Sequence, residues 1–197
     1  MKPKSPLFLI LFVLVLVAAG WQAVGDPARE ERGVVQERLD RASPSLAPGE
    51  SVGQTFFCEH DGLRAIEFLL VRYKPEEEIP SSARIELTLE SLDGTDAAPI
   101  RVELGASGLE HNQTLRFSFS PIPDSGGVPY RLTLRCNSDH ALGVWTSSTE
   151  AYAFGDLFQN GEKVEGDLRF VTFYDYHLSD ALVDGVRETV RRVPFLP

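Results

Sequence analysis

Residues of the types that perform catalysis are few and isolated in this 197-residue chain. The four histidines, His60, His111, His140 and His177, occur singly. The sequence contains no GxSxG elbow, HExxH zinc motif, Walker loop or GxGxxG dinucleotide motif. A glycosidase needs only two carboxylates, so a glycan hydrolase is the enzyme class that the many acidic residues leave open. The motifs predict a protein that is not an enzyme and has no catalytic residues, metal or cofactor.

Aromatic side chains in the last third of the chain give a better candidate site. Sugars bind to flat aromatic faces that have a few polar groups beside them, and Tyr174 and Tyr176 share one face of a predicted strand. We therefore predict that Trp145, Tyr152, Tyr174 and Tyr176 bind a ligand. The alternative is that Trp145 and much of this set belong to the hydrophobic core.

The two cysteines, Cys58 and Cys136, each lie at the end of a predicted strand. In an oxidising compartment an even number of cysteines favours a disulfide, and two buried free thiols are the alternative. His60 lies two residues from Cys58, but no second cluster of metal-binding residues completes a site.

An apolar segment at the N-terminus determines where the protein works. Thirteen apolar residues run from Leu7 to Ala19, after Lys2 and Lys4. Extended through Gly25, this segment would form a helix about 28 Å long, close to the thickness of a bilayer core. We predict that residues 1–25 are a transmembrane anchor that contacts lipid through residues 6–25. The alternative is a cleaved signal peptide followed by secretion. Both place the rest of the chain outside the cytoplasm, and the first makes it a single-pass protein of the cell membrane.

The remainder of the chain is acidic. The protein has 19 Lys and Arg against 29 Asp and Glu, a net charge of −10. Lys2 and Lys4 are the only charges in residues 1–25, so the rest carries 17 basic and 29 acidic residues, net −12. This balance excludes a basic nucleic-acid-binding surface and a polybasic membrane-binding surface. It also predicts that ligand binding does not depend on attraction to anionic polymers.

From residue 50 to residue 177 the hydrophobic pattern alternates as it does in half-buried strands. Turn signals such as Asp61-Gly62 and Asn160-Gly161 separate the alternating segments. We predict an all-β fold, an antiparallel β-sandwich of the jelly-roll type with about eight strands. The candidate strands are Val52–Cys58, Leu63–Tyr73, Ala83–Glu90, Ile100–Leu104, Thr114–Ser120, Tyr130–Cys136, Leu142–Thr146 and Leu168–Tyr176.

Two segments flank this domain. Residues 26–49 are highly charged and then rich in Pro, Ser and Ala, which is typical of a stalk or linker. Residues 178–197 predict a short amphipathic helix and tail, because Leu178, Leu182, Val186 and Val193 fall on one side of a helix.

Several segments together resemble a jelly-roll module of bacterial envelope proteins. They lie within roughly residues 49–176, at Ser51–Phe56, Gly62–Ile66, Phe117–Gly126, Tyr130–Leu134, Gly155–Leu157, Asn160–Gly161 and Gly166–Phe170. The family looks like an uncharacterised extracytoplasmic β-sandwich. In longer relatives it is attached to membrane-embedded regions that resemble glycosyltransferases acting on lipid-linked sugars. The resemblance implies an extracytoplasmic β-sandwich and transfers no catalytic or binding residue.

Three functions follow as hypotheses. The first is a non-catalytic, membrane-anchored module that binds envelope glycan or a glycosyltransferase-like membrane partner. The second is a structural or assembly subunit that packs on another membrane protein, which an exposed apolar patch would favour. The third is a hydrolase of envelope glycans, which requires paired carboxylates in a groove.

Overall fold

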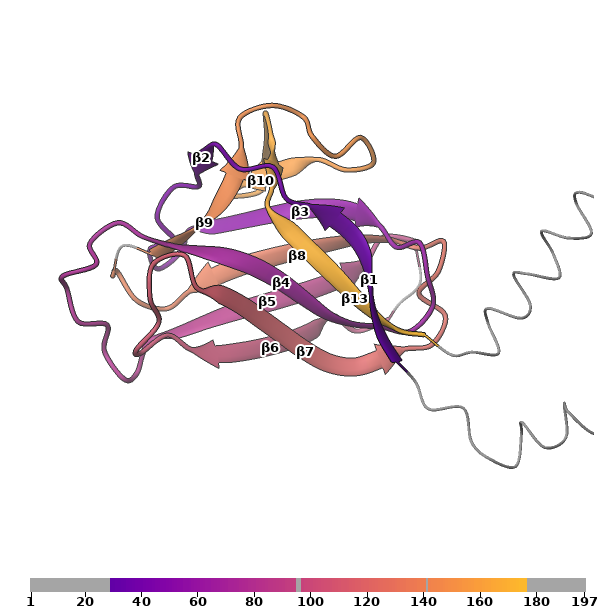
Figure 1. The fold of residues 1–197 in the computed structure, drawn as a ribbon, viewed down its shortest axis with the longest axis horizontal. Helices are drawn as coiled ribbons and strands as arrows, with labels where there is room; N and C mark the ends of the chain where they lie inside the picture. The colour runs from indigo at the N-terminus through magenta and orange to yellow at the C-terminus, as the bar shows by residue number, and fades with distance from the viewer. Residues whose placement is uncertain (1–28, 95–96, 141, 177–197) are drawn as a thin grey trace, which may run out of the picture. The chain divides into compact units, whose positions relative to one another are not determined.

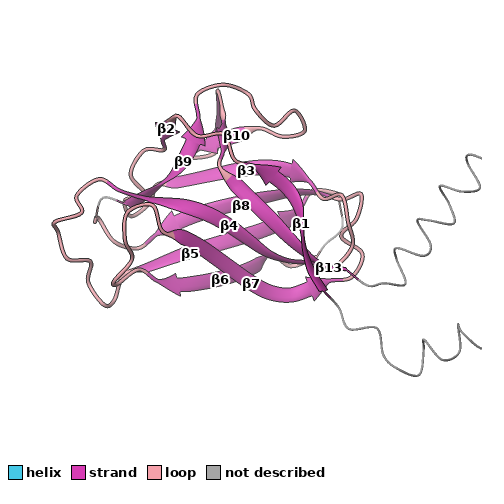
Figure 2. Ribbon diagram, viewed as in Figure 1, coloured by secondary structure: helices cyan, strands magenta, loops and turns pink. Residues whose placement is uncertain are grey.

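A computed structural model describes residues 29–94, 97–140 and 142–176 of the protein. Almost all of them belong to one compact unit, Glu30–Asp175. The fold is all-β, with two antiparallel sheets and no helix among the described residues (Figures 1 and 2). The predicted anchor over residues 1–25 and the predicted helix over residues 178–197 lie outside the described residues.

The first sheet has seven strands. Its main path runs β1 (Arg29–Gln36), β13 (Phe170–Tyr176), β4 (Leu63–Arg72), β9 (Leu142–Ser147) and β12 (Asp167–Leu168). β2 (Arg41–Ala42) pairs with β9, and β7 (Thr114–Ile122) pairs with β4. β4 is the central strand, because β13 and β9 pair with successive parts of it.

The second sheet has six strands in the order β11 (Glu162–Val164), β10 (Leu157–Gln159), β3 (Ser51–Phe57), β8 (Pro129–Cys136), β5 (Arg84–Ser91) and β6 (Ile100–Gly105). Its central strands alternate regularly. On β5, Ile85, Leu87 and Leu89 are buried in the core, so Glu86, Thr88 and Glu90 point to the opposite face.

The hydrophobic core lies between the two sheets. It joins Phe68 and Phe117 of the seven-stranded sheet to Ile85 and Leu132 of the six-stranded sheet in one cluster. The rings of Phe56 on β3 and Phe170 on β13 lie 5.6 Å apart, a direct contact between the sheets. In Figure 1 the layer of β13, β4 and β7 lies over the layer of β3, β8 and β5. This arrangement is β-sandwich-like.

The eight predicted strands are confirmed, each ending within two residues of its predicted bounds. The structure adds β1, β2, β10, β11 and β12. Four of these have two or three residues, too few for an alternating pattern to be recognised in a sequence.

The predicted stalk over residues 26–49 differs from the structure, because part of it belongs to the seven-stranded sheet. β1 lies beside β13, and the Val34 N–H donates a 2.8 Å hydrogen bond to Oγ1 of Thr172. Leu46 is buried in the core, and its N–H bonds to the Leu142 carbonyl. Only alternate residues at the end of β1, Val34 and Gln36, are buried. The charges on the rest of the strand hid this short alternation.

Of the two alternatives left open for Cys58 and Cys136, a disulfide or two free thiols, the structure has two buried free thiols. β3 and β8 are antiparallel, with Ser51 opposite Arg135 and Phe57 opposite Pro129. The two cysteines therefore lie at opposite ends of the strand pair, about 27 Å apart at the usual rise per residue. A disulfide requires Cα atoms within about 7 Å. Burial raises the pKa of both thiols, which keeps them protonated at neutral pH.

Candidate functional site

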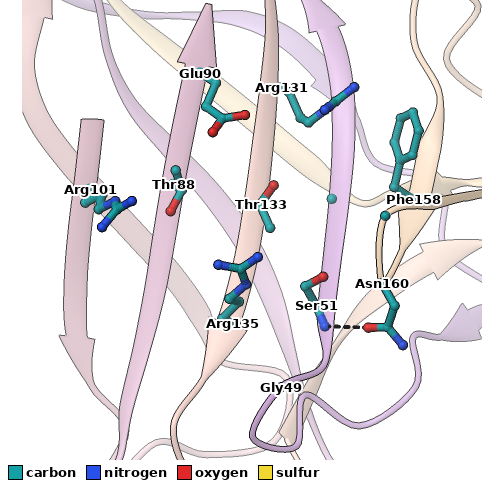
Figure 3. A pocket seen from close by; sticks show the side chains of 12 residues that line it. Gly49, Ser51, Thr88, Glu90, Arg101, Arg131, Thr133, Arg135, Phe158 and Asn160 are labelled. Atoms are coloured by element: carbon teal, nitrogen blue, oxygen red, sulfur yellow. Dashed lines mark hydrogen bonds between the residues drawn. The ribbon is translucent and has the colours of Figure 1, made fainter. Parts of the chain in front are cut away.

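The outer face of the six-stranded sheet carries a pocket of about 350 Å³ (Figure 3). Its lining comes from β3, β8, β5, β6 and the β10–β11 hairpin, and it is mainly polar. The lining residues are Gly49, Ser51, Gly53, Thr88, Glu90, Arg101, Arg131, Thr133, Arg135, Phe158, Asn160 and Gly161.

The register of the strands brings distant residues into one row across the sheet. Phe158 lies opposite Gly53, Gly53 opposite Thr133, Thr133 opposite Thr88, and Thr88 opposite Arg101. Side chains at paired positions of neighbouring strands point to the same face. The row therefore begins at an aromatic ring, crosses two threonine hydroxyls and ends at a guanidinium.

Two further arginines extend the site along β8. Arg131 and Arg135 flank Thr133 on the same face. Glu90 lies opposite Arg131 and is the only carboxylate among the described residues that line the pocket. The site therefore has three cations and one anion on a protein that is acidic as a whole.

Gly53 makes space in the middle of this row. A Cβ atom at this position would lie 2.7 Å from the Leu132 carbonyl oxygen and 3.4 Å from Oγ1 of Thr133. The absence of a side chain leaves the floor of the pocket open between Phe158 and Thr133.

The three arginines are not neutralised by an ion pair within the described part of the protein. The side chains of Arg101, Arg131 and Arg135 form no hydrogen bond or ion pair there, and Nε of Arg131 is buried without a partner. The contact of Arg131 is aromatic instead, because its guanidinium carbon lies 5.1 Å from the ring centre of Phe158. Apart from the buried Nε of Arg131, the guanidinium donors are available for a ligand.

Two arginines of the seven-stranded sheet, in contrast, form ion pairs. Arg116 pairs with Glu67 at 2.9 Å and with Glu30, and it lies over the ring of Phe173. Arg64 pairs with Asp175 at 2.5 Å. Carboxylates thus pair with Arg64 and Arg116, whereas the pocket arginines form no ion pair with a described residue. A buried Nε without a hydrogen-bond partner is common to Arg64 and Arg131.

A tight hairpin forms the aromatic wall of the pocket. β10 and β11 are joined by Asn160 and Gly161, whose φ angles of 53° and 84° are those of a type I′ turn. The side chain of Asn160 accepts a 2.8 Å hydrogen bond from the Ser51 N–H (Figure 3). This bond fixes the hairpin tip against β3.

A buried carboxylate holds the segment that leads into this hairpin. Asp167 is fully buried and accepts hydrogen bonds from Nε2 of Gln54 at 3.0 Å and from the N–H groups of Ala151 and Tyr152 at 2.5 and 2.9 Å. Gln54 in turn accepts a bond from the Leu168 N–H. With these hydrogen bonds the buried carboxylate has partners for its oxygens, and it joins β3, β12 and the loop before β10.

The aromatic residues predicted from the sequence do not line this pocket and do not form one site. Trp145 is half-buried on β9 and donates through Nε1 to Oδ1 of Asn112 at 2.7 Å. Tyr174 is only 8% exposed and stacks on His60. On β4, Leu70 pairs with Val144, the residue before Trp145, and Leu63 pairs with Tyr174. The two aromatic residues therefore lie near opposite ends of β4, about 20 Å apart along the strand.

The other two predicted residues are also separate from the pocket. Tyr152 is half-buried against Phe170, and its hydroxyl bonds to the Phe57 backbone. Tyr176, the last described residue, is half-buried at the end of β13.

Sequence reasoning missed the three arginines because it treated alternating polar residues as a hydrated sheet face. The segment Arg131–Arg135 did show arginines on one face with Thr133 between them. Their convergence with Arg101 and Phe158 depends on strand order, which the sequence pattern does not contain.

Within the described ranges, no three His, Cys, Asp or Glu side chains gather in a way that could hold a metal ion. None of the described residues forms a helix long and apolar enough to cross a membrane. Comparison of the chain with protein-family models and with curated protein sequences gives no match.

Proposed function

We propose that this protein is a non-catalytic binding module that takes a glycan in the pocket on its six-stranded sheet. The observation that carries the proposal is the composition of the pocket: an aromatic wall at Phe158, a floor without a side chain at Gly53, and hydroxyl, amide and guanidinium groups around them. A sugar presents an apolar ring face and many hydroxyls, so it needs this mixture of partners.

The number of carboxylates favours binding over hydrolysis. Glycosidases use a pair of carboxyl groups about 5–10 Å apart. Among the described residues, Glu90 is the only carboxylate that lines the pocket. The volume of the pocket, about 350 Å³, lies at the lower end of the range for small-ligand sites.

The remaining parts of the proposal come from the sequence. We propose that the two antiparallel sheets form a jelly roll, that residues 1–25 anchor the protein, and that the domain works outside the cytoplasm. The resemblance to envelope-protein modules supports an envelope glycan as the ligand. An anchored module would meet such glycans at high local concentration, so modest affinity would suffice.

Glycan binding can be tested with the full chain in detergent micelles, applied to arrays of acidic and neutral oligosaccharides. We expect retention of a subset of glycans, and we expect Phe158→Ala to weaken it about tenfold by removing the aromatic wall. Phe154→Ala is the matched control, because Phe154 is 73% exposed and does not line the pocket. Absence of binding to every glycan, or equal losses in both variants, would contradict the proposal.

A second candidate, packing on another protein, is favoured by an apolar surface at one end of the same sheet. Phe57 and Leu92 are 42% and 41% exposed, and both adjoin Pro129. Tyr152 bonds to Phe57 and lies edge-on to Phe154. We expect the double variant Phe57→Ser, Leu92→Ser to lower the assembly size of the full chain in sedimentation experiments if this surface is an interface. An unchanged size would contradict self-assembly through it.

A further inference from the structure

The pocket holds unpaired positive charge on an acidic protein. Beyond residue 25 the chain has 29 acidic against 17 basic residues. Arg101, Arg131 and Arg135 nevertheless form no ion pair within the described residues, whereas Arg64 and Arg116 of the other sheet do. Guanidinium groups form their strongest hydrogen bonds with oxyanions. Their unused donors therefore point to an anionic group on the ligand.

Arg101 and Arg135 can reach the same point. They lie on strands separated by β5 and are one row apart, so their Cα atoms are about 12 Å from each other. Figure 3 shows the Arg101 guanidinium directed toward Thr88 and that of Arg135 directed toward Thr133. An oxyanion above these threonines would meet two guanidinium groups.

The hydroxyls of the two threonines have different roles. The Thr88 hydroxyl already donates to Oε1 of Glu86, at 3.3 Å. Thr133 forms no side-chain hydrogen bond with a described residue, so its hydroxyl can donate to the ligand. Glu86 is the cross-strand neighbour of Arg135, but it forms no ion pair with it and does not line the pocket.

The other end of the pocket has a different character. Arg131 lies over Phe158 and opposite Glu90. Glu90 reduces the positive potential there and offers its carboxylate oxygens to sugar hydroxyls. The guanidinium groups of Arg101 and Arg135 thus lie at one end of the pocket, and Glu90 and the Arg131–Phe158 contact lie at the other.

We propose that the ligand is an acidic glycan whose single anionic group, a carboxylate or a phosphate, is held by Arg101, Arg135 and Thr133, while a neutral sugar ring contacts Phe158. This inference rests on the proposed glycan-binding function. The net charge of the surrounding protein repels a polyanion at long range, so an isolated acidic group fits better than a densely charged polymer. This proposal is compatible with the prediction that binding does not depend on attraction to anionic polymers, because the proposed attraction is local to one anionic group.

Titration calorimetry of the full chain in detergent micelles tests the inference with three probes. These are an oligosaccharide ending in glucuronate, the same oligosaccharide ending in glucose, and one ending in glucose 6-phosphate. We expect at least one acidic probe to bind about tenfold more tightly than the neutral one, because charge-assisted hydrogen bonds are stronger than neutral ones. The better of the two acidic probes identifies the anionic group.

Charge-removing variants locate the anionic group. Arg101→Gln and Arg135→Gln should each abolish most of the preference for the acidic probe while leaving binding of the neutral probe within about twofold. Arg38→Gln is the matched control, because Arg38 is exposed and outside the pocket. Thermal unfolding of each variant shows whether the fold is kept. Loss of the preference in the control as well would overturn the assignment.

The outcomes separate the two proposals. Equal affinity of the wild-type chain for acidic and neutral probes would overturn the inference and leave glycan binding intact. Binding to none of the three probes, together with no retention on the glycan arrays, would overturn both.

Discussion

Arg131 and Phe158 approach each other across the pocket, with the guanidinium carbon 5.1 Å from the ring centre. Both side chains are half-buried, and they come from β8 and β10, which lie on opposite sides of β3. The contact therefore links the centre of the sheet to the hairpin that forms the pocket wall, before any ligand is bound.

A double-mutant cycle measures this contact. We expect Arg131→Ala and Phe158→Ala to show a coupling of about 0.5–1 kcal/mol in urea denaturation, the usual size for a partly exposed cation–π pair. Arg135→Ala combined with Phe158→Ala is the matched cycle and should show additive effects. Equal coupling in the two cycles would mean that the Arg131–Phe158 contact contributes nothing specific.

Replacing Glu90 should strengthen the binding of an acidic glycan. Glu90→Gln keeps the shape of the side chain and removes the only carboxylate among the described lining residues, so we expect the affinity for the glucuronate probe to rise about two- to fivefold. Glu150→Gln makes the same charge change at an exposed position outside the pocket and should have little effect. A weaker affinity in Glu90→Gln would show that this carboxylate is a hydrogen-bond acceptor for the ligand.

The buried carboxylate of Asp167 is expected to dominate the stability of the segment that precedes β10. Asp167→Ala leaves the N–H groups of Ala151 and Tyr152 and Nε2 of Gln54 without their acceptor, which should cost about 2–4 kcal/mol in urea denaturation. Asp156→Ala removes a carboxylate that is paired with Lys163 at the surface and should cost under about 1 kcal/mol.

Hydrogen exchange distinguishes the effect of Asp167 from general destabilisation. We expect Asp167→Ala to speed exchange first at residues 151–159, while β5 and β8 keep their protection. Uniform acceleration over both sheets would contradict a local role.

Gly155 lies too close to β3 for any side chain. A Cβ atom at this position would lie 1.7 Å from the Thr55 carbonyl oxygen, so Gly155→Ala must displace backbone and should lower the urea midpoint and weaken glycan binding. Gly105→Ala is the control, since a Cβ there meets nothing within 4 Å. Equal midpoints in the two variants would contradict this explanation.

Tyr130 should make the fold sensitive to alkaline pH. Burial raises its pKa from 10 to about 12, so the folded state keeps the phenol neutral where the unfolded state already ionises it. The contribution is fully present below pH 10 and is lost as pH rises from 10 toward 12. We expect the wild-type urea midpoint to fall more steeply over this range than that of Tyr130→Phe. Parallel pH profiles would rule out Tyr130 as the cause.

The alternation of polar and apolar residues predicted most of the fold, because one face of a long strand packs on the core and the other contacts water. β8 alternates in burial along its whole length, β5 alternates except at the buried Thr88, and the predicted bounds of both hold within one residue. β1 was missed because its buried positions occur only at one end, after four exposed residues. β10, β11 and β12 are held by the turn at Asn160 and by the Asp167 bonds rather than by an apolar pattern of their own.

The candidate site was less accessible to sequence reasoning. Residue type indicated that aromatic side chains could bind sugar, but it could not separate Tyr174, which is buried against His60, from Phe158, which lines the pocket. Arg101 and Phe158 are 57 positions apart in the sequence and meet in one row only because β3, β8 and β5 lie between their strands. Strand order and register therefore decide the site.

The β10–β11 hairpin has a consequence for how ligand preference could change. It carries three of the lining residues, Phe158, Asn160 and Gly161, yet a Cβ at Gly161 would touch nothing within 4 Å. Residues inserted at this two-residue turn would extend the wall outward without disturbing the packed sheets. The hairpin is thus a part of the rim that engineered variants can lengthen to change ligand preference while the arginine-bearing strands stay unchanged.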